Sequence, residues 1–385
     1  AYLRAKEDYL MGINFSRVLT LKYGRNISSY LKTDKTVISV GRVMTCVLGM
    51  IVRREREIRA FVKMPFYRVI GKTLIGDTSF DAEWKTSETS RFYNTPYLYK
   101  DNGFKDRTKA QELVDYLSDP LPAEGSVTAI ERKKEVKNPP LLFNLAELQN
   151  ECSKLFKISP DQTLAVVQEL YEKKLVTYPR TDARVLSSAI SKEIDKNIRG
   201  LCSYAPLKDI ASQVLEEKSY VNIGKSRYCD DKKITDHYAI IPTGQGFGAM
   251  RGLSQTASRV YEVIARRFLS IFFPSAEYAK VSVSLNVKKE LFSASFKVLS
   301  KEGYLYVMKN SFAKSQDSEE NDEATLQALK KVKKGDILPV EEFSIKEGET
   351  SPPKRYNSGS IILAMENAGQ LIEDEELRAQ IKGSG

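Results

Sequence analysis

The chain alternates between segments with a helical pattern and segments with the texture of strands. Residues 1–62 are predicted to be helical. Residues 66–137 carry short β-type runs, such as 67–70 and 127–130, separated by Gly, Asp and Asn, which is typical of strands and turns. A Pro-Pro pair at 139–140 then marks a joint between the β-rich segment and the next part of the chain.

Two helices with clear start signals are predicted after the Pro-Pro pair. Each has a residue that can cap its N-terminus and a Glu or Gln at the third helical position, which is the capping-box pattern. The second also has proline at its first helical position, where proline is favoured, and is predicted to run to about residue 174. Helix, turn, helix and then an extended segment, 175–178, resemble a winged-helix arrangement, and such units often hold DNA. The start signals are Asn144 and Glu147 in the first helix, and Ser159, Pro160 and Gln162 in the second.

The second half of the chain returns to strand texture after another helix. Residues 255–273 have apolar positions on one helical face, and a hairpin comes next, in which apolar residues alternate along 281–287 and 292–298. The polar stretch 315–322 is predicted to be a solvated loop, and a final helix is predicted at about 358–368. One β-domain interrupted by a helical domain explains this pattern best, so the predicted fold class is α+β and multidomain.

The charge balance favours a polyanionic partner. The formal net charge of the 385 residues is +10, and nucleic acid is the commonest soluble polyanion, although a basic surface without a dedicated partner fits the charge equally well. Four cysteines lie far apart, which argues against a zinc site and a disulfide framework. No apolar run reaches membrane-spanning length and no signal peptide opens the chain, so we predict a cytoplasmic protein with no membrane partner.

The segment 177–182, Thr-Tyr-Pro-Arg-Thr-Asp, is the strongest chemical signal. Pro179 favours extended backbone at Tyr178, and residues two apart on an extended chain point the same way, so Tyr178 and Arg180 are predicted to share a face. A phenol beside a guanidinium suits attack on a phosphodiester, because the cation favours the phenolate and stabilises charge on the phosphoryl oxygens. An isolated Tyr-Pro-Arg would more often be structural, so the other motifs in the chain must decide whether this one is catalytic.

The segment resembles the nucleophile motif of type IA DNA topoisomerases, and of their topoisomerase III branch in particular. Four further segments resemble motifs of the same family, and all five occur in the family's order along the whole chain. These are Arg4, Asp8, Gly12 and Asn14 in an R-x-x-x-D-x-x-x-G-x-N pattern, Ser-Val-Gly-Arg-Val at 39–43, Asp-His-Tyr-Ala-Ile-Ile-Pro-Thr at 236–243, and Pro-Lys-Arg-Tyr at 353–356 followed by Ser360 and 364–369. Chance does not produce five such matches in order.

The resemblance implies a role for each matching residue. Tyr178 would be the nucleophile, Arg180 would position and neutralise the scissile phosphate, and His237 would lie near the active site and contact the DNA backbone. A second group would hold the single-stranded DNA that leads to the site. That group consists of Ser39, Arg42 and Ser360, which would grip the strand, and of Arg4 and Asp8, which would order the groove. Without the motif, Arg42 would be an ordinary surface cation.

The resemblance also implies the architecture and the reaction. Residues 1–62 and 351–385 would form a helical DNA-gripping domain, 63–138 and 251–350 a β-rich arch, and 139–250 a winged-helix-like domain that bears the tyrosine. The whole enzyme would be a monomer that acts on single-stranded regions of DNA. It would cleave one strand through a 5′-phosphotyrosine intermediate, pass another strand and reseal, without ATP.

Three residues depart from the family pattern near its motifs. Met44 stands where the family usually has a base-contacting Gln, Cys46 stands where it has Pro, and Ala183 replaces a frequent Ser. The first departure puts one DNA contact in doubt. None of them removes the tyrosine or its arginine.

The larger departure is an absence. The family's acidic D-x-D-x-E cluster, which holds Mg²⁺ together with a catalytic Glu, would precede residue 1. The acidic stretches 230–231 and 373–376 look like solvated faces rather than substitutes. The chain opens on Ala1 and closes on Lys-Gly-Ser-Gly at 382–385, so we expect a fragment that lacks the metal-binding domain, has no metal site of its own and does not relax DNA alone.

Two other functions fit part of the sequence. A non-catalytic module that binds single-stranded DNA would suit the basic charge and the 20 tyrosines. A tyrosine recombinase needs several Arg and His residues around its tyrosine, including an H-x-x-R pattern. The single histidine, His237, is followed by Tyr-Ala-Ile, so the recombinase pattern fails.

Overall fold

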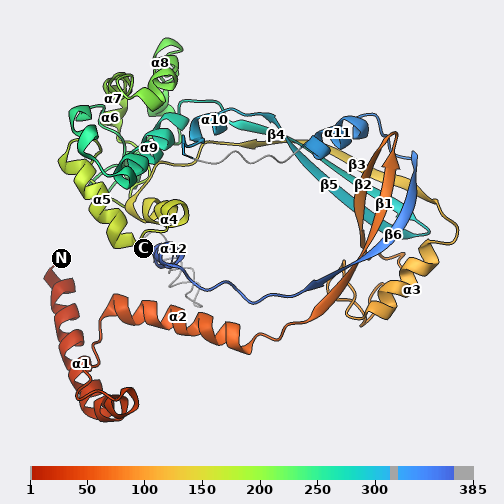
Figure 1. Ribbon diagram of the computed structural model, residues 1–385, viewed down its shortest axis with the longest axis horizontal. Helices are drawn as coiled ribbons and strands as arrows, with labels where there is room; N and C mark the ends of the chain where they lie inside the picture. Colours follow the sequence, from red (N-terminus) through yellow and green to blue (C-terminus); the bar gives the residue numbers. More distant parts are fainter. Residues whose placement is uncertain (1, 313–319, 368–385) are drawn as a thin grey trace. The chain divides into compact units, whose positions relative to one another are not determined.

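The computed structural model describes residues 2–312 and 320–367, and the chain divides into two compact units. The first unit is Ala1–Val62 with Pro352–Gly385, and the second is Lys63–Ser351. Figure 1 labels the helices and strands of both units. The predicted five-segment domain division stays a prediction.

The first unit is helical, as predicted, but its first 62 residues form two helices rather than one continuous segment. Helices α1 (Tyr2–Leu31) and α2 (Arg42–Ala60) are separated by a non-helical connection that lies along α1. The hydroxyls of Ser16 and Thr20 accept hydrogen bonds from backbone N–H groups of that connection, at 2.8 Å from Val40 and 2.9 Å from Ile38.

Glycine makes this close approach possible. A Cβ atom on Gly24 would lie 3.1 Å from the carbonyl oxygen of Thr36, and one on Gly12 would lie 3.4 Å from the carbonyl oxygen of Val40. Gly12, Ser16, Thr20 and Gly24 succeed one another at four-residue spacing, so they share one face of α1. The connection is therefore held against the helix by small residues and by two hydroxyl acceptors.

The chain returns to the first unit through residues 352–357 and helix α12 (Ser358–Glu366). The guanidinium of Arg54 on α2 donates to the carbonyl oxygen of Lys354 (2.6 Å) and to the hydroxyl of Tyr356 (3.1 Å), and it lies 4.3 Å from the centre of the Tyr356 ring. Arg355 makes two hydrogen bonds to the carboxylate of Glu55. The predicted helix at 358–368 is confirmed to Glu366, and residues from 368 onward, with the acidic stretch 373–376, lie outside the described residues.

The β-strands of the second unit close one antiparallel barrel, in the order β1-β2-β5-β4-β3-β6 (Figure 1). Strands from before the helical segment pair with strands from after it at β2–β5, β3–β4, β3–β6 and β1–β6, which confirms that the two stretches of β texture belong to one sheet. Helices α3 (Arg107–Leu117) and α11 (Glu320–Leu329) pack buried leucines against its core. The strands are β1 (Pro65–Ile75), β2 (Thr78–Lys85), β3 (Ala123–Lys137), β4 (Ala276–Val287), β5 (Glu290–Lys301) and β6 (Ile337–Glu349).

A buried carboxylate fixes the loop after β2. Glu290, at the start of β5, is fully buried and accepts hydrogen bonds from the indole N–H of Trp84 (2.8 Å), the hydroxyl of Ser90 (2.6 Å) and the backbone N–H of Arg91 (3.0 Å). Trp84 stacks on Phe104 with ring centroids 4.9 Å apart. These bonds compensate the desolvation of the carboxylate, because an unpaired buried charge would be strongly unfavourable.

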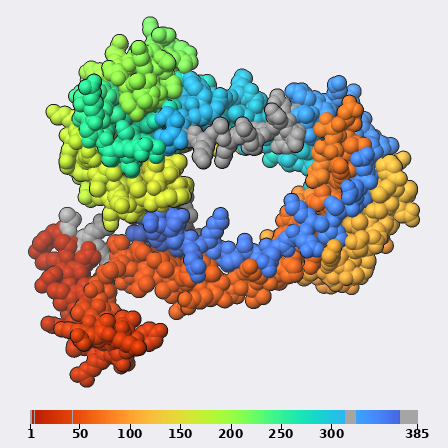
Figure 2. Space-filling model, in the orientation of Figure 1, coloured from red at the N-terminus to blue at the C-terminus, as the bar shows by residue number. Residues whose placement is uncertain are grey.

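The helical part of the second unit has its own core, built around α9. Almost the whole length of α9 is buried, including Tyr261, Ile264 and Phe268. In Figure 2 this part forms a continuous packed mass, coloured yellow-green to cyan. The predicted helix at 255–273 ends earlier, at Ser270. The α-helices here are α4 (Leu145–Phe156), α5 (Pro160–Glu172), α6 (Ser188–Lys192), α7 (Ile194–Leu201), α8 (Lys208–Glu216), α9 (Gln255–Ser270) and α10 (Leu305–Met308), with short 3-10 turns at 205–207, 223–225, 231–233 and 247–252.

The two predicted helix starts have different outcomes. Helix α5 begins with the complete capping box of Ser159 and Gln162, with Pro160 at its first position, as predicted. Helix α4 is capped by Asn144, whose side chain accepts from the backbone N–H of Glu147 (2.9 Å). The carboxylate of Glu147, however, is engaged with Arg184 rather than completing a box.

Candidate active site

The chain reaches Tyr178 along a short extended segment that pairs with residues 239–242. Val176 pairs with Pro242 in an antiparallel bridge, and the backbone N–H of Thr177 donates to the carbonyl oxygen of Ile241 (3.0 Å). The hydroxyl of Thr177 donates to the carbonyl of Ala239 (3.1 Å) and accepts from the N–H of Ile241 (3.0 Å). The segment that carries Tyr178 therefore lies beside the predicted motif at 236–243.

The ring of Tyr178 contacts two other rings. Its centroid is 4.5 Å from that of His237, with the planes inclined at 48°, and 5.5 Å from that of Tyr171, with the planes at 79°. Tyr178 is half-buried, whereas His237 is exposed. Two residues of the predicted catalytic set, Tyr178 and His237, are thus in direct contact.

Arg180 lies at a tight turn. The backbone N–H of Thr181 donates to the carbonyl oxygen of Pro179 (3.1 Å), which is the hydrogen bond of a γ-turn centred on Arg180. The extended chain is interrupted at Arg180 by this turn, and the shared face of Tyr178 and Arg180 stays a prediction. Arg180 is exposed beside the tyrosine in sequence, and its role toward phosphate stays a prediction.

Thr181 joins the two motif segments. Its hydroxyl donates to the carbonyl oxygen of His237 (2.7 Å) and accepts from the backbone N–H of Ala183 (3.1 Å), and its side chain is buried. The Ala183 position, which departs from the family pattern, is itself buried beneath this turn.

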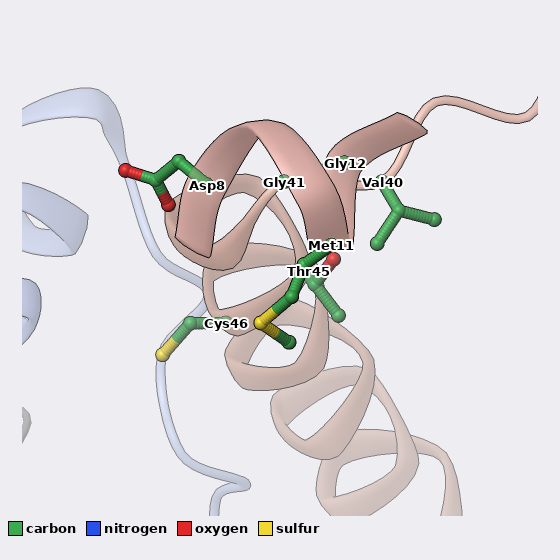
Figure 3. A pocket seen from close by; sticks show the side chains of 7 residues that line it. All are labelled: Asp8, Met11, Gly12, Val40, Gly41, Thr45 and Cys46. Atoms are coloured by element: carbon green, nitrogen blue, oxygen red, sulfur yellow. The ribbon is translucent and has the colours of Figure 1, made fainter. Parts of the chain in front are cut away.

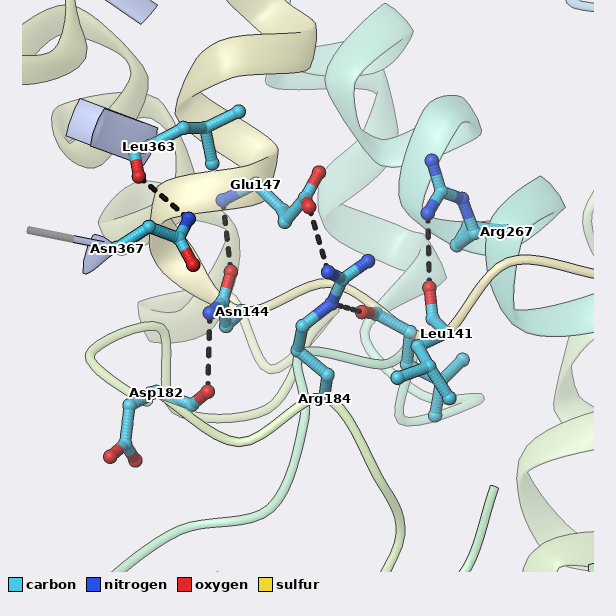
Figure 4. Close-up of polar contacts among 9 residues, drawn as sticks. Leu141, Asn144, Glu147, Asp182, Arg184, Arg267, Leu363 and Asn367 are labelled. Atoms are coloured by element: carbon cyan, nitrogen blue, oxygen red, sulfur yellow. Dashed lines mark hydrogen bonds and ion pairs between the residues drawn. The ribbon is translucent and has the colours of Figure 1, made fainter. Parts of the chain in front are cut away.

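A polar network attaches the residues after Tyr178 to helix α4 (Figure 4). The side-chain amide of Asn144 donates to the carbonyl oxygen of Asp182 (3.1 Å), so one residue both caps α4 and holds the loop. Arg184 forms an ion pair with Glu147 (2.7 Å) and donates to the carbonyl of Leu142 (3.3 Å). The carboxylate of Asp182 accepts from the hydroxyl of Thr235 (3.1 Å), which ties the loop again to the segment before His237.

Arg267 of α9 contacts the segment just before α4. Its guanidinium donates to the carbonyl oxygen of Leu141 (3.0 Å) and lies 4.0 Å from the centre of the Phe143 ring. Burial lowers the pKa of Arg267, although Glu151 and Glu147 favour its charged form. Arg267 is buried, so its guanidinium acts on the segment that leads into α4.

The DNA-gripping residues predicted in the first unit lie on or beside its helices. Asp8, in α1, lines a pocket of about 300 Å³ together with Gly12, Gly41 and Cys46 (Figure 3). Ser39 is exposed in the connection before α2, Arg42 is the first residue of α2, and Arg4 lies in α1. Their contacts with DNA stay predictions.

Ser360 has a structural role of its own. Its backbone N–H donates to the side chain of Asn357 (2.8 Å), and its hydroxyl accepts from the backbone N–H of Asn357 (2.9 Å), which completes a capping box at the start of α12. The same hydroxyl also donates to the carbonyl oxygen of Asn357 (3.2 Å). A contact of this hydroxyl with DNA would therefore compete with the cap.

Three features of the site were not indicated by the sequence. They are the contact of Tyr171 with Tyr178, the role of Asn144 as a loop anchor, and the ion pair of Glu147 with Arg184. Tyr171 stands at the end of a predicted helix, where nothing in the sequence indicates which way its ring points. The other two depend on side chains that are distant in sequence.

Metal ligands do not gather in the described part of the chain. There, no three His, Cys, Asp or Glu side chains form a group that could hold a metal ion. The side chains described thus do not fit Mg²⁺, and no step of the proposed chemistry passes through it. Within residues 2–312 and 320–367, no helix combines the length and hydrophobicity needed to cross a membrane.

Comparison with known proteins identifies the class. A family model described as DNA topoisomerase matches residues 1–370. A solved structure, full-length topoisomerase I of Thermotoga maritima, covers 95% of this chain with a TM-score of 0.58 at 22% identity, and the chain covers 55% of it. The chain belongs to the DNA topoisomerase family, in its type IA class.

Curated relatives indicate to which branch of the topoisomerase family the chain is similar. DNA topoisomerase 3 of Bacillus subtilis is 34% identical over 380 residues, which are 98% of this chain and 47% of the relative. DNA topoisomerase 3 of Salmonella typhimurium is 33% identical over 386 residues, which are 100% of this chain and 55% of the relative. The chain is thus topoisomerase III-like, as the motifs predicted, and spans about half the length of these relatives.

Proposed function

We propose that this chain supplies the strand-cleaving tyrosine of a topoisomerase III-like enzyme, with Tyr178 as the nucleophile. The observation that carries the proposal is the ring contact between Tyr178 and His237, because each belongs to a segment that resembles the family's active site. The half-buried position of Tyr178 supports it as well, since a held ring presents its hydroxyl in few orientations.

The reaction exchanges one phosphate ester for another. The phenolic oxygen of Tyr178 attacks the phosphorus of a DNA phosphodiester and the phenol gives up its proton. The bond from phosphorus to the 3′ oxygen breaks, and that oxygen takes up a proton and leaves as a 3′-hydroxyl. The DNA is then joined to Tyr178 through its 5′-phosphate. Attack of the 3′-hydroxyl on this phosphotyrosine restores the DNA and the free phenol, and no ATP is needed because the two esters have similar energies.

Arg180 and His237 act on the phosphate in this proposal. Arg180 offers paired N–H donors that match two phosphate oxygens, and its permanent charge stabilises the charge that develops on them during attack. His237, exposed beside the nucleophile, contacts the DNA backbone next to the scissile bond.

The remaining parts guide DNA. Residues 1–62 and 351–385 form the DNA-gripping domain, 63–138 and 251–350 the arch, and 139–250 a winged-helix-like domain that bears Tyr178. The gripping domain binds single-stranded DNA through its predicted contact residues. These are Ser39, Arg42 and Ser360, with Arg4 and Asp8 ordering the groove.

The whole enzyme works as a cytoplasmic monomer, and Mg²⁺ is held outside this chain. The chain alone then binds single-stranded DNA, more weakly as salt rises, and does not relax supercoiled DNA. Relaxation of a supercoiled plasmid by residues 1–385 alone would contradict this part of the proposal.

The test is a covalent adduct. The full-length gene product is incubated with single-stranded oligonucleotide and Mg²⁺, denatured, and examined for DNA bound to protein. The proposal predicts an adduct in the wild type and none in Tyr178→Phe. DNA binding without any adduct would instead favour a non-catalytic module that binds single-stranded DNA.

A further inference from the structure

The ring of a second tyrosine, Tyr171, contacts the ring of the proposed nucleophile, Tyr178. Tyr171 lies in the last turn of α5, and its ring meets that of Tyr178 edge-on, with centroids 5.5 Å apart and planes at 79°. This is the T-shaped arrangement that aromatic pairs favour. The ring centroid of His237 lies 4.5 Å from that of Tyr178, so two aromatic rings contact the Tyr178 ring.

We propose that Tyr171 is a positioning residue for Tyr178, whose ring fixes the orientation of the Tyr178 phenol for attack on phosphate. The inference rests on the proposed function, because it needs Tyr178 to be the nucleophile. Tyr171 itself takes no part in bond making or breaking.

The backbone holds Tyr171 in place. Helix α5 ends at Glu172, and the N–H of Lys174 then donates to the carbonyl oxygen of Tyr171 (2.8 Å). Lys174 adopts a left-handed conformation, with φ of 61°, which turns the chain back toward Tyr178. The N–H of Leu175 donates to the carbonyl oxygen of Leu170 (2.9 Å), and both leucine side chains are fully buried. Tyr171 therefore stands on a turn that is fixed immediately before and after it.

Because Tyr171 is partly exposed, an effect of its ring on Tyr178 can be measured apart from an effect on the stability of the fold. Its side chain is 39% exposed, whereas its neighbour Leu170 is fully buried, so the ring of Tyr171 is not part of the core. A large aromatic ring kept at the surface against one partner restricts that partner's side-chain rotation, because the alternative rotamers of Tyr178 would lose the contact. Removing the ring should therefore free Tyr178 without unfolding the helix.

The first measurement is the rate of a single round of cleavage by the full-length gene product with Mg²⁺. Tyr171→Leu is expected to cleave about 2- to 12-fold more slowly, which is the range that about 0.5–1.5 kcal/mol of an aromatic pair represents at 1.36 kcal/mol per tenfold. Its dissociation constant for the same oligonucleotide should stay within about twofold, because the contact acts on Tyr178 and not on DNA. Tyr171→Phe keeps the ring and should keep the wild-type rate.

The matched control is Tyr93→Leu, which removes a tyrosine of similar exposure (44%) from the loop after β2 and should change neither quantity. Wild-type cleavage by Tyr171→Leu would overturn the inference, as would a loss explained wholly by weaker binding. An adduct that survives Tyr178→Phe but not Tyr171→Phe would overturn it too, since Tyr171 would then be the nucleophile.

A second readout needs neither DNA nor metal. Residues 1–385 are prepared with 3-fluorotyrosine at position 178, and the ¹⁹F resonance of that ring is recorded. Tyr171→Leu should move this resonance, while Tyr171→Phe and Tyr93→Leu should leave it near its wild-type position. An unmoved resonance in Tyr171→Leu contradicts the ring contact even if cleavage is normal. If the wild type forms no adduct but the resonance moves, the proposed function fails and the contact stands.

Discussion

The hydroxyl of Thr181 donates a hydrogen bond of 2.7 Å to the carbonyl oxygen of His237. This bond joins two segments that lie far apart in sequence, and each carries one of the two rings in contact at the candidate site. Because the Thr181 side chain is buried, water cannot take the place of the hydrogen bonds that its hydroxyl makes to His237 and Ala183.

Thr181→Val tests this bond with almost no change in side-chain volume. The carbonyl of His237 and the N–H of Ala183 both lose their partner, so we expect the free energy of unfolding of the helical part to fall by about 1–3 kcal/mol. Thr181→Ser retains the hydroxyl and should lose much less. Urea unfolding monitored by far-ultraviolet circular dichroism measures both, and equal losses in the two variants would show that the methyl group matters rather than the bond.

Arg180 should act on the chemical step more than on binding. Arg180→Ala is expected to lower the single-turnover cleavage rate of the full-length protein by roughly 100- to 1000-fold, as for loss of a donor that stabilises transition-state charge. Arg180→Lys should recover only part of the rate, because an ammonium cannot pair with two phosphate oxygens at once. The control is Lys192→Ala, at the exposed end of α6, which should leave the rate unchanged. Rates of Arg180→Ala near wild type would remove Arg180 from the mechanism.

The buried carboxylate of Glu290 gives a prediction that the single tryptophan can report. Glu290→Gln replaces one acceptor oxygen by an N–H₂ group, so at least one of the donors of Trp84, Ser90 and Arg91 loses its partner. We expect the barrel to lose about 1–3 kcal/mol of stability, with a change in the fluorescence of Trp84, the only tryptophan in the chain.

The matched control for Glu290 is Glu342→Gln, on an exposed position of β6, which should leave both the emission and the unfolding midpoint unchanged. Unchanged stability and emission in Glu290→Gln itself would mean that the carboxylate does not hold the loop.

Glu262 should make the stability of the helical part depend on pH. Its buried carboxylate accepts hydrogen bonds from Arg266 (2.6 Å) and from the hydroxyl (2.6 Å) and N–H (2.8 Å) of Ser311. Burial by itself raises the pKa of Glu262, but the bonds from Ser311 and Arg266 outweigh it and hold the pKa below 4.5. A pKa lower in the folded than in the unfolded state stabilises the fold above about pH 4.5, and that stabilisation is lost as pH falls through the folded-state value.

Glu262→Gln should therefore destabilise the fold by about 3–5 kcal/mol at pH 7, since it leaves Arg266 buried without its counter-charge. The difference from wild type should shrink as pH falls below 4.5. The control Glu169→Gln breaks only an exposed pair with Lys173 and should cost less than about 1 kcal/mol at any pH. A difference between Glu262→Gln and wild type that does not depend on pH would contradict the assignment.

The features that the sequence predicted are those with local causes. The capping box of Ser159 and Gln162 spans four residues, and the alternation along β4 and β5 spans one hairpin, so both could be recognised without knowing the fold. The family motifs located Tyr178 and His237 separately, and only the fold shows that their rings are in contact.

The features that the sequence missed depend on the fold or on competition between partners. Glu147 has the right spacing for a capping box, but Arg184 reaches it across the loop and offers a charged partner. The shared face of Tyr178 and Arg180 stays a prediction, and the γ-turn centred on Arg180 is a local feature that the sequence did not indicate. Nothing in the sequence marks Glu290 as a buried acceptor, because its three donors lie about 200 residues earlier, in β2 and in the loop after it.

The most direct measurement is the covalent adduct itself, traced to its attachment site. The full-length protein is trapped on single-stranded oligonucleotide labelled at either end, digested, and the modified peptide identified by mass spectrometry. We predict a 5′-phosphate ester on Tyr178, absent from Tyr178→Phe, with oligonucleotide binding unchanged in that variant within about threefold, because the lost hydroxyl is one of many DNA contacts. An adduct on another residue, or one that persists in Tyr178→Phe, would contradict the account.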